Sequence, residues 1–517
     1  MERTIPNLFD ATVAAAPSKI WLLHGDRSFS YEQAHAAVSA GAAALAGLGV
    51  GQGDLVLVTL RNTPEYLFTW LGLMRLGAIL VAANPAASEM ELGGLAGQTE
   101  PRLVVTDPDL HQVVDGALAG VGSAARRADV DTLFDPSDGN AGCPGAGAGP
   151  RPEDPAVLIP TSGTTGRSKL VTQTHLAYVM AGEGFPWWLE LTADDRLMTS
   201  LPLFHINAPA YSVLGSVAAG ASLVLLPRFS ASNFLDSARR YGATEFNAIG
   251  AMVELLMRQP ERDDDADNPL RLCYTGPAPT EERQLQIEHR FGLRLVSGYA
   301  MSETPYGTVW RRSTRPYGTL GSIRQHPTLG EINEGRVVAD GKPVAPGEVG
   351  ELELRNPAVM KGYWGMPEET AAVLGPDGWL RTGDLVRDNG DGTYTFVGRQ
   401  KEVIRRRGEN LAPAEVEEAL ASHPDVVETA VVGVASELSE EEVKAFVVLR
   451  TGASPDLPGL HTWAAERLAR FKVPRYLEVV DELPHTPTGR VAKHQLPKER
   501  TSHEWDAVTT REEHRTP

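Results

Sequence analysis

Residues 156–169 read AVLIPTSGTTGRSK, an apolar run followed by Thr, Ser and Gly and closed by a lysine. The apolar run predicts a buried strand, and Gly163 and Gly166 in the loop after it let backbone N–H groups converge on an anion. The hydroxyl groups and Lys169 suit a polyphosphate, although the loop lacks the Gly-Lys-Ser/Thr end of a P-loop. The preceding strand and the closing lysine favour an anion site over an exposed Gly/Thr linker. The candidate phosphate-binding residues are Thr161, Ser162, Gly163, Thr164, Thr165, Gly166 and Lys169.

Short apolar runs alternate with amphipathic segments on both sides of this loop. We expect strands at residues 55–60, 78–82 and 103–106, and a helix at 64–76. This βαβ rhythm predicts an α/β fold of mostly parallel sheets with helices packed on them. Residues 136–155 are rich in Gly, Ala and Pro, and we interpret them as a loop inside one large domain.

A second unit begins near residue 399. After a closing strand at 392–398, the pattern predicts helices at 413–422 and 460–470 and strands at 426–434 and 444–449, which is typical of a compact α+β domain. We therefore predict a large multi-sheet N-terminal domain and a small mobile α+β C-terminal domain whose polar tail after about residue 498 is disordered. The predicted boundaries are 1–398 for the first domain, 399–401 for the hinge and 402–517 for the second domain.

Composition narrows the classes of partner. The 517 residues carry a formal net charge of −19, which argues against nucleic acid or an anionic membrane as a partner. Only Cys143 and Cys273 are present, so a disulfide scaffold is not supported and a reducing cytosol fits. The N-terminus lacks a signal-peptide pattern, and no uninterrupted apolar run reaches the roughly 18 residues of a spanning helix. We expect a cytoplasmic protein without a membrane span.

The loop at 161–169 resembles the phosphate loop of the adenylate-forming superfamily, which includes acyl- and aryl-CoA ligases, adenylation domains of peptide synthetases and firefly luciferase. Further segments match that superfamily in its order, and the resemblance covers about residues 1–497. LPLFHINAP at 201–209 and RFSASNF at 228–234 resemble the carnitine/crotonobetaine-type CoA ligases. The other matching segments are 274–279 (YTGPAP), 298–304 (GYAMSET), 378–384 (GWLRTGD), 398–401 (GRQK), 406–410 (RRGEN) and 483–493 (LPHTPTGRVAK).

The resemblance implies a nucleotide site. Tyr299 would stack on adenine, Ser302 would donate to a phosphate oxygen, and Glu303 would bind Mg²⁺, which prefers hard oxygen ligands. Asp384 would accept from ribose hydroxyls, and Arg399 would contact the ribose or a phosphate. Each of these residues alone is also compatible with an ordinary structural or surface role. The turn expected under the adenine contains Gly276, Pro277 and Ala278.

The resemblance also implies an acyl and thiol site. His205 would lie near the acyl carboxylate, and its rotation would admit the thiol. Gly408 would lie in the loop that faces the site after the small domain rotates about Lys401, where a side chain would obstruct the pantetheine path. Three segments, 204–211, 246–252 and 299–304, are expected to wall the acyl pocket. The candidate acyl-binding residues are Phe204, Asn207, Gly250, Gly298, Ala300 and Met301.

The reaction of the family has two halves. A carboxylate first attacks the α-phosphate of ATP and gives acyl-AMP and pyrophosphate, and a CoA thiol then attacks the acyl carbon. The implied cofactors are ATP or AMP (or acyl-AMP), CoA and Mg²⁺, and the implied substrates are a carboxylic acid or acyl-adenylate and CoA.

One residue departs from the family pattern. The last motif usually reads Thr-x-x-Gly-Lys, and its lysine serves the first half-reaction, but this chain has Arg490 at that position. A guanidinium is a broad planar fork, whereas an ammonium is compact, so the substitution keeps the charge and changes the shape. We predict impaired adenylation with thioester formation retained, and a separate adenylating enzyme as a possible partner. Lys493 lies three residues further on and matches a different, commonly basic position.

Several functions remain open on the residues alone. A CoA ligase, complete or confined to thioester formation, fits the motifs best. An adenylase that loads a carrier protein would share them, a luciferase-like oxygenase would need a motif that the chain lacks, and a non-catalytic nucleotide-binding protein would not need the intact site residues. The motifs do not identify the acid.

Overall fold

The computed structural model describes residues 2–134, 149–161, 168–276, 279–310, 315–406, 409–436, 441–453, 456–486, 491–501 and 503–507. The chain packs into two compact units. Unit 1 contains Met1–Gly335 and Leu354–Arg381, and unit 2 contains Arg336–Glu353 and Thr382–Pro517. The predicted class, a large α/β unit of several sheets with a smaller α+β unit, is confirmed. The expected hinge at 399–401 lies within unit 2 and stays a prediction.

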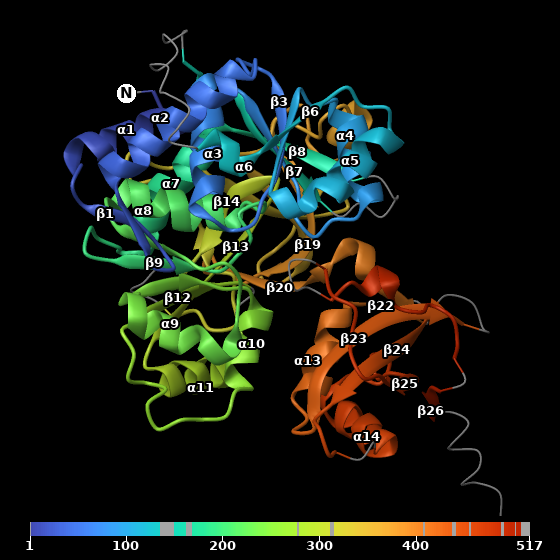
Figure 1. The fold of residues 1–517 in the computed structure, drawn as a ribbon. Helices are drawn as coiled ribbons and strands as arrows, with labels where there is room; N and C mark the ends of the chain where they lie inside the picture. The colour runs from blue at the N-terminus through green and yellow to red at the C-terminus, as the bar shows by residue number, and fades with distance from the viewer. Residues whose placement is uncertain are drawn as a thin grey trace, which may run out of the picture. The chain divides into compact units, whose positions relative to one another are not determined.

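A six-stranded sheet of unit 1 has helices on both faces (Figure 1). Val56 and Val58 of its strand β3 pack into the core with helices α2 and α3, whereas Leu57 packs with α4 and α5. Neighbouring strands are parallel except for the last pair, β7 and β8. The strands in spatial order are β6 (Arg126–Asp129), β5 (Leu103–Thr106), β3 (Leu55–Thr59), β4 (Ile79–Ala82), β7 (Pro155–Thr161) and β8 (Lys169–Thr174). The helices are α2 (Tyr31–Gly47), α3 (Pro64–Leu76), α4 (Glu89–Thr99) and α5 (His111–Gly120).

The strands and the helix expected around these residues are confirmed, and local chemistry explains the sharpest match. In α3 the Thr63 side chain accepts from the Tyr66 N–H, Pro64 occupies the first turn, and Gly77 ends the helix at a φ of 66°. Pairing of β4 with β7 places the residues before and after the Gly/Ala/Pro-rich segment in one unit. Residues 136–148 of that segment, including Cys143, and the preceding residue 135 lie outside the described part of the chain.

A nine-stranded sheet forms the rest of the unit 1 framework. Six consecutive strands of it, β1, β10, β9, β11, β12 and β13, run parallel, and the edge strands β2, β14 and β15 are antiparallel. Its strands in spatial order are β15 (Ser322–Ile323), β14 (Thr304–Val309), β13 (Arg294–Met301), β12 (Leu272–Thr275), β11 (Glu245–Asn247), β9 (Arg196–Thr199), β10 (Ser222–Leu225), β1 (Ile20–His24) and β2 (Arg27–Ser30). The remaining helices of unit 1 are α1 (Ile5–Ala15), α6 (Val130–Leu133), α7 (His175–Leu189), α8 (Leu214–Ala219), α9 (Phe234–Tyr241), α10 (Gly250–Met257), α11 (Glu281–Phe291) and α12 (Pro367–Val373), with a π-helical segment at Ala208–Val213.

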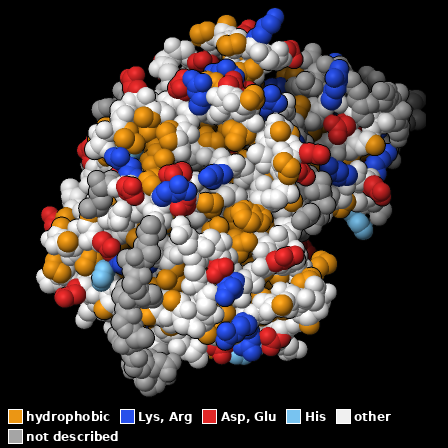
Figure 2. Space-filling model, turned by 90° about the horizontal axis from the view of Figure 1, so that it is seen from above, with side chains coloured by type: hydrophobic (Ala, Val, Ile, Leu, Met, Phe, Trp, Pro, Cys, Tyr) orange, Lys and Arg blue, Asp and Glu red, His pale blue; other side chains and the backbone are white. Residues whose placement is uncertain are grey.

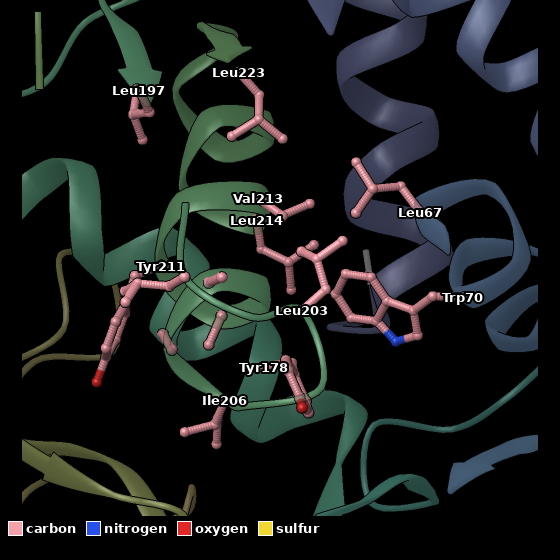
Figure 3. Close-up of a cluster of buried hydrophobic side chains, with 14 of the residues drawn as sticks. Leu67, Trp70, Tyr178, Leu197, Leu203, Ile206, Tyr211, Val213, Leu214 and Leu223 are labelled. Atoms are coloured by element: carbon pink, nitrogen blue, oxygen red, sulfur yellow. The ribbon is translucent and has the colours of Figure 1, made fainter. Parts of the chain in front are cut away.

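The segment between β9 and α8 is anchored in the core of unit 1. Leu203 and Ile206, which flank Phe204 and His205, belong to the same buried cluster as Tyr211, Val213 and Leu214 (Figure 3). This cluster also contains Leu67 and Trp70 of α3 and Tyr178 of α7. The predicted histidine-bearing segment is therefore fixed by apolar side chains on both sides of the histidine.

The described residues of unit 2 form most of one sheet, a second sheet, a hairpin, two α-helices and short 3₁₀ helices. One sheet has the order β17 (Lys342–Pro343), β16 (Glu334–Ala339), β18 (Val349–Arg355), β19 (Leu380–Asp388) and β20 (Tyr394–Arg399). The other has the order β23 (Val426–Ala435), β24 (Glu441–Leu449), β25 (Tyr476–Val479) and β26 (Trp505–Asp506). Strands β21 (Ile404–Arg406) and β22 (Glu409–Leu411) pair with each other, and the helices are α13 (Pro413–Ala421) and α14 (Leu457–Arg467).

Two expectations for unit 2 are corrected. The helix expected at 460–470 begins earlier, at Leu457, because the Asp456 side chain accepts from the Gly459 N–H and caps the first turn. The tail expected to be disordered after residue 498 is ordered in its described part up to Ala507, because β26 pairs with β25 and Asp506 forms an ion pair with Arg475. Residues 508–517 lie outside the described part.

A buried ion cluster also anchors this tail. The Lys444 side chain is fully buried, and its ammonium lies 2.7 Å from a carboxylate oxygen of Glu478 and 2.8 Å from one of Glu504. Removing one partner of a buried charge cluster leaves the other charges uncompensated.

The surface charges and the buried cysteine do little to narrow the choice of function. Acidic and basic side chains are interspersed on the face in Figure 2, together with apolar side chains. Cys273 is a free and buried thiol. None of the helices in the described residues is long and apolar enough to cross a membrane.

Substitution of Lys444 with alanine is expected to destabilise unit 2 by about 3–5 kcal/mol, because Glu478 loses its buried cation and Glu504 keeps only the guanidinium of Arg500. Hydrogen exchange of the β23–β25 amides in the full chain measures this as faster exchange. Lys342→Ala, which changes an exposed lysine in β17, is the matched control and should shift stability by less than about 0.5 kcal/mol. Equal losses of stability in Lys444→Ala and Lys342→Ala would contradict the view that the Lys444 ion cluster stabilises unit 2.

Candidate functional site

Strands β9, β11, β12 and β13 end at one edge of the nine-stranded sheet. They are neighbours and parallel, so their carboxyl ends meet there, which is where α/β sheets place their ligands. The segments that leave this edge keep His205, Asn207 and Tyr299 half-buried. The predicted residues on these segments are Phe204, His205, Asn207, Gly250, Gly276, Gly298, Tyr299, Ala300, Met301, Ser302 and Glu303.

Two close backbone approaches hold the Tyr299 segment. A Cβ atom added to Gly276 would lie 2.4 Å from the carbonyl oxygen of Gly298, and one added to Gly307 would lie 2.2 Å from that of Tyr299. Both positions therefore require glycine, and the backbone of Tyr299 is confined between neighbouring strands. Its hydroxyl donates to the sulfur of Met301 at 3.6 Å.

An apolar ring, an imidazole and an amide lie together on the histidine-bearing segment. The ring centroids of Phe204 and His205 are 4.6 Å apart. The buried Asn247 side chain donates through Nδ2 to Oδ1 of Asn207 at 2.9 Å and fixes that half-buried amide. A Cβ added to Gly250, the first residue of α10, would meet no atom within 4 Å. This combination of side chains suits the wall of a pocket that binds an organic group with some polar character.

The two arms of the predicted phosphate loop are antiparallel strands. Thr161 ends β7 and pairs in register with Lys169 of β8, and the Thr161 hydroxyl donates to the Lys169 carbonyl at 3.2 Å. The Lys169 ammonium lies 4.6 Å from the centroid of the Tyr363 ring, within the range of a cation–π interaction. The arms are thus in place for a loop between them, whose residues lie outside the described part.

Three contacts position Ser302 and Glu303. The Tyr363 hydroxyl donates to Oε1 of Glu303 at 2.9 Å, the Gln173 side chain donates to the Ser302 carbonyl at 2.6 Å, and the Met360 N–H donates to the Glu303 carbonyl at 2.8 Å. Burial raises the pKa of Tyr363 well above its usual range, and the neighbouring Glu303 raises it further, so the phenol keeps its proton and remains the donor. The hydroxyl of Tyr363 bonds to Glu303 and its ring contacts Lys169. Tyr363 therefore connects Glu303 with the strand that follows the predicted phosphate loop.

This region suits a Mg²⁺ ion that is shared with a phosphate. Glu303 supplies a hard carboxylate oxygen, which is the ligand type that Mg²⁺ prefers. The described residues contain no group of three or more His, Cys, Asp or Glu side chains that could hold a metal by themselves. One carboxylate with phosphate oxygens and water matches the way Mg²⁺ binds with nucleotides.

Unit 2 carries the other described candidates. Asp384 of β19 is paired in register with Arg399 of β20, and the guanidinium Nε lies 3.0 Å from Oδ1 of Asp384. The Asp384 side chain is 3% exposed and that of Arg399 is 48% exposed. Lys401 lies in the short 3₁₀ helix Gln400–Glu402 and is exposed.

Lys493 is held by carboxylates within unit 2. Its ammonium lies 3.0 Å from an oxygen of Glu402 and 2.8 Å from one of Glu417. Burial opposes the charge, but Glu417 and Glu402 outweigh it and raise the pKa of Lys493, so the side chain stays protonated. This lysine serves an internal ion pair beside the predicted hinge.

Several predicted residues lie outside the part of the chain that the structure describes, so their positions stay predictions, as do the roles of all the candidates. They are Ser162, Gly163, Thr164, Thr165, Gly166, Pro277, Ala278, Gly408 and Arg490.

Sequence reasoning missed Tyr363 and Gln173, two side chains that position the candidates. It placed Asn247 in the segment 246–252 expected to wall the acyl pocket, but gave that side chain no role of its own. Tyr363 stands in KGYWG at 361–365, where an aromatic pair between glycines was the available signal. Gln173 and Asn247 lie in strands, and no spacing in the sequence relates them to Ser302 or Asn207. These contacts join residues that are 129 and 40 positions apart along the chain.

Comparisons with known proteins identify the family of the chain. The family described as "AMP-binding enzyme" matches residues 9–364, and "AMP-binding enzyme C-terminal domain" matches residues 415–490. A crotonobetaine/carnitine–CoA ligase from Salmonella agona is 31% identical over 500 residues, covering 91% of this chain and 93% of that protein.

Two solved enzymes share the fold over nearly the whole chain. ATP-bound MatB from Rhodopseudomonas palustris has a TM-score of 0.86 and 28% identity, covering 95% of this chain and 98% of that one. The o-succinylbenzoate CoA synthetase MenE from Bacillus subtilis, in complex with its acyl-adenylate intermediate OSB-AMP, has a TM-score of 0.84 and 28% identity, covering 96% and 99%. MenE has also been solved with ATP and a magnesium ion.

Replacement of Tyr363 with phenylalanine is expected to weaken Mg²⁺-dependent ATP binding by about 10-fold, because a hydrogen bond to a charged group is worth about 1.5 kcal/mol or more. Calorimetry at saturating Mg²⁺ measures the affinity. Tyr241→Phe is the matched control, since it removes an exposed hydroxyl that donates to the Gly25 carbonyl. An unchanged affinity in Tyr363→Phe would show that Glu303 needs no such support.

Proposed function

This chain belongs to the AMP-binding enzyme family, and we propose that its own contribution to acyl-CoA synthesis is chiefly the second half-reaction, thioester formation from a supplied acyl-adenylate. It is an acyl-CoA ligase that acts through an acyl-AMP intermediate, with ATP or AMP, CoA and Mg²⁺ as cofactors. The observation that carries the finer proposal is the arginine of Thr486-Pro487-Thr488-Gly489-Arg490, where the family pattern has lysine.

The two half-reactions make different demands. In the first, a carboxylate oxygen bonds to the α-phosphorus of ATP, pyrophosphate leaves, and negative charge develops between carboxylate and phosphate. In the second, the CoA thiol loses its proton, sulfur bonds to the acyl carbon, and AMP leaves with the electron pair. AMP is a good leaving group, so the second step needs mainly orientation and a path for the thiol.

A guanidinium at position 490 suits the first step poorly. Lysine presents a compact ammonium on a thin stem that can follow the developing charge, whereas Arg490 is broad and planar. Loss of one well-placed oxyanion donor costs about 10²–10³-fold in rate, and a displacement of about 1 Å costs about 10²-fold. We propose that the second step escapes this penalty, because the rotated small domain no longer presents residue 490 to the α-phosphate.

Lys493 is a poor substitute for the missing lysine. Its ammonium is held between Glu402 and Glu417 at 3.0 and 2.8 Å, so moving it to a phosphate would leave two carboxylates without their cation. Burial also raises the pKa of the Glu417 carboxyl, so its ionised form depends on the nearby Lys493 ammonium. These contacts support a dedicated internal role for Lys493.

We propose that the remaining candidates have the roles that the resemblance to the family implies. Tyr299 stacks on adenine, Glu303 binds Mg²⁺ with Ser302 on a phosphate, and His205 controls thiol entry. The buried Asp384 accepts from ribose hydroxyls, and its pairing with Arg399 orients its carboxylate. The phosphate loop comprises Thr161–Lys169, the adenine turn contains Gly276, Pro277 and Ala278, and the acyl wall comprises Phe204, Asn207, Gly250, Gly298, Ala300 and Met301.

The proposal implies a partner. If this chain adenylates poorly, a separate adenylating enzyme must supply acyl-AMP, and both proteins would share the reducing cytosol that the two cysteines suit. The likeness to crotonobetaine/carnitine–CoA ligases supports a small organic acid without naming one. The second candidate function is the complete ATP-dependent ligase, which the overall match to that family favours.

Wild-type protein with ATP, Mg²⁺ and a panel of crotonobetaine, benzoate, anthranilate and o-succinylbenzoate is expected to release pyrophosphate at least about 10²-fold more slowly than Arg490→Lys, because lysine restores the compact cation. Supplied with the preformed acyl-adenylates and CoA, the wild type should form acyl-CoA at a rate similar to the variant. Rapid ATP-dependent adenylation by the wild type would return the chain to the complete ligases.

Lys401→Pro tests the proposed hinge. Proline fixes φ near −65°, so rotation about this position should be hindered and thioester formation should fall by about 10-fold or more. Affinity for AMP should be unchanged, because binding precedes the rotation. The exposed Lys361→Ala serves as a control for the loss of a surface lysine, and undiminished thioester formation in Lys401→Pro would place the hinge elsewhere.

A further inference from the structure

Arg324 is a fully buried arginine in unit 1, directly after β15. Its Nε donates to the Thr308 carbonyl at 2.8 Å, and Nη1 donates to the Tyr211 hydroxyl at 2.6 Å and to the Pro305 carbonyl at 3.1 Å. Nη2 donates to the Tyr274 hydroxyl. One side chain thus bonds to groups from three separate elements, β14, β12 and the π-helical segment.

Only neutral groups compensate this cation. Among the residues that the structure describes, no carboxylate pairs with Arg324. The rings of Trp188, Tyr211 and Tyr274 lie 4.6, 5.2 and 5.5 Å from its Cζ atom, within cation–π range. Burying a cation without an acid is costly, so an apolar residue would be the cheaper way to fill this space. The guanidinium therefore points to a task that requires its forked hydrogen bonds.

The bonded elements are the ones that carry the site. The π-helical segment with Tyr211 begins one residue after Asn207, and β14 with Pro305 begins directly after Glu303. Tyr211 also donates directly to the Pro305 carbonyl at 2.6 Å. The Ala210 N–H donates to the Ile206 carbonyl at 3.0 Å, so the backbone next to Tyr211 is bonded to the residue that follows His205; Figure 3 labels Ile206 and Tyr211.

Arg324 also sets the position of Gly298 and Tyr299. A Cβ atom added to Gly298 would lie 2.7 Å from Nη2 of Arg324, so the guanidinium packs directly against that backbone. Thr308, whose carbonyl accepts from Arg324, is paired in register with Tyr299. The same side chain therefore contacts the strand that carries the aromatic residue and the helix turn that follows the histidine.

We propose that Arg324 is a positioning residue that fixes the histidine-bearing segment, residues 203–207, relative to the Tyr299–Glu303 segment, so that the acyl and nucleotide halves of an acyl-adenylate are held in register. This inference rests on the proposed function, because it takes an acyl-adenylate as the ligand that contacts both segments. AMP contacts only the nucleotide side, so loss of Arg324 should weaken acyl-adenylate binding more than AMP binding.

The test compares two probes by calorimetry on the full chain. The probes are AMP and the acyl-sulfamoyladenosine, a stable analogue of acyl-AMP, that the wild type binds most tightly among the crotonobetainyl, benzoyl, anthraniloyl and o-succinylbenzoyl forms. In Arg324→Gln, we expect the affinity for the analogue to fall about 100-fold and the affinity for AMP to fall less than about 5-fold. A displacement of about 1 Å between the two segments is costly only for a ligand that contacts both of them. Equal losses for the two probes, or none, would overturn the proposal.

Arg290→Gln is the matched control. Arg290 is also nearly buried, pairs with Asp265 at 2.8 Å, and donates to the carbonyls of Met257, Gln259 and Pro260. Its substitution should lower the melting temperature and leave both affinities unchanged. A purely structural role for Arg324 would give this same pattern in Arg324→Gln and would contradict the proposal.

Arg324→Lys separates geometry from charge. A single ammonium cannot reach all the acceptors that the guanidinium joins, so this variant should lose nearly as much analogue affinity as Arg324→Gln. Full recovery by lysine would show that charge alone matters and would overturn the positioning role.

Hydrogen exchange provides an arm without any ligand. Arg324→Gln should speed exchange in both segments, at residues 205–213 and 299–309, while the amides around Arg290 stay protected. Faster exchange in one segment alone would contradict the coupling. None of these measurements needs CoA or turnover, so their outcome is independent of whether the wild type adenylates or forms thioesters.

Discussion

Parallel pairing of β11, β12 and β13 is the constraint on which the candidate site of unit 1 depends. It brings the ends of the three strands to one edge, and the close approach of Gly276 to the Gly298 carbonyl leaves no freedom in how the Tyr299 segment starts. The residues proposed to hold adenine, magnesium and the acyl group all follow from that edge. A side chain at either glycine would separate the strands and displace the ligand-binding groups together.

Polar side chains then fix what the sheet has placed. Tyr363, Gln173 and Asn247 each donate one hydrogen bond to a candidate residue or its backbone, and Arg324 joins two candidate segments from beneath. Because these bonds form when the protein folds, the side chains are already ordered when the ligand binds. Without such bonds, ligand binding would have to supply the free energy that orders them. Catalysis by orientation, which a good leaving group permits, depends on this kind of support.

Unit 2 contains the residues that bear on the proposed separation of the two half-reactions. Its ion pairs are already assigned, with Asp384 bound to Arg399 and Lys493 held by Glu402 and Glu417. A lysine that is committed to two carboxylates cannot also serve a phosphate without leaving them uncompensated. This commitment of Lys493 supports the proposal that the shape of residue 490 decides the rate of adenylation.

The sequence by itself determined the elements whose signals are local, and the motifs with their order. The helix predicted at 64–76 has the same bounds in the structure, where Thr63, Pro64 and Gly77 fix its ends through contacts within one turn. The replacement of lysine by Arg490 is visible only as sequence. The helix expected at 460–470 was misplaced because the cap at Asp456 was not recognised, and the tail expected to be disordered is held in its described part by Lys444 and Arg475, which are distant along the chain. Tertiary structure alone decided the contacts of Tyr363 with Glu303 and of Arg324 with Tyr211, across 60 and 113 positions. Hydrophobic periodicity and capping report on neighbours within a few residues, whereas these side chains meet only because the fold brings together segments that are far apart in the sequence.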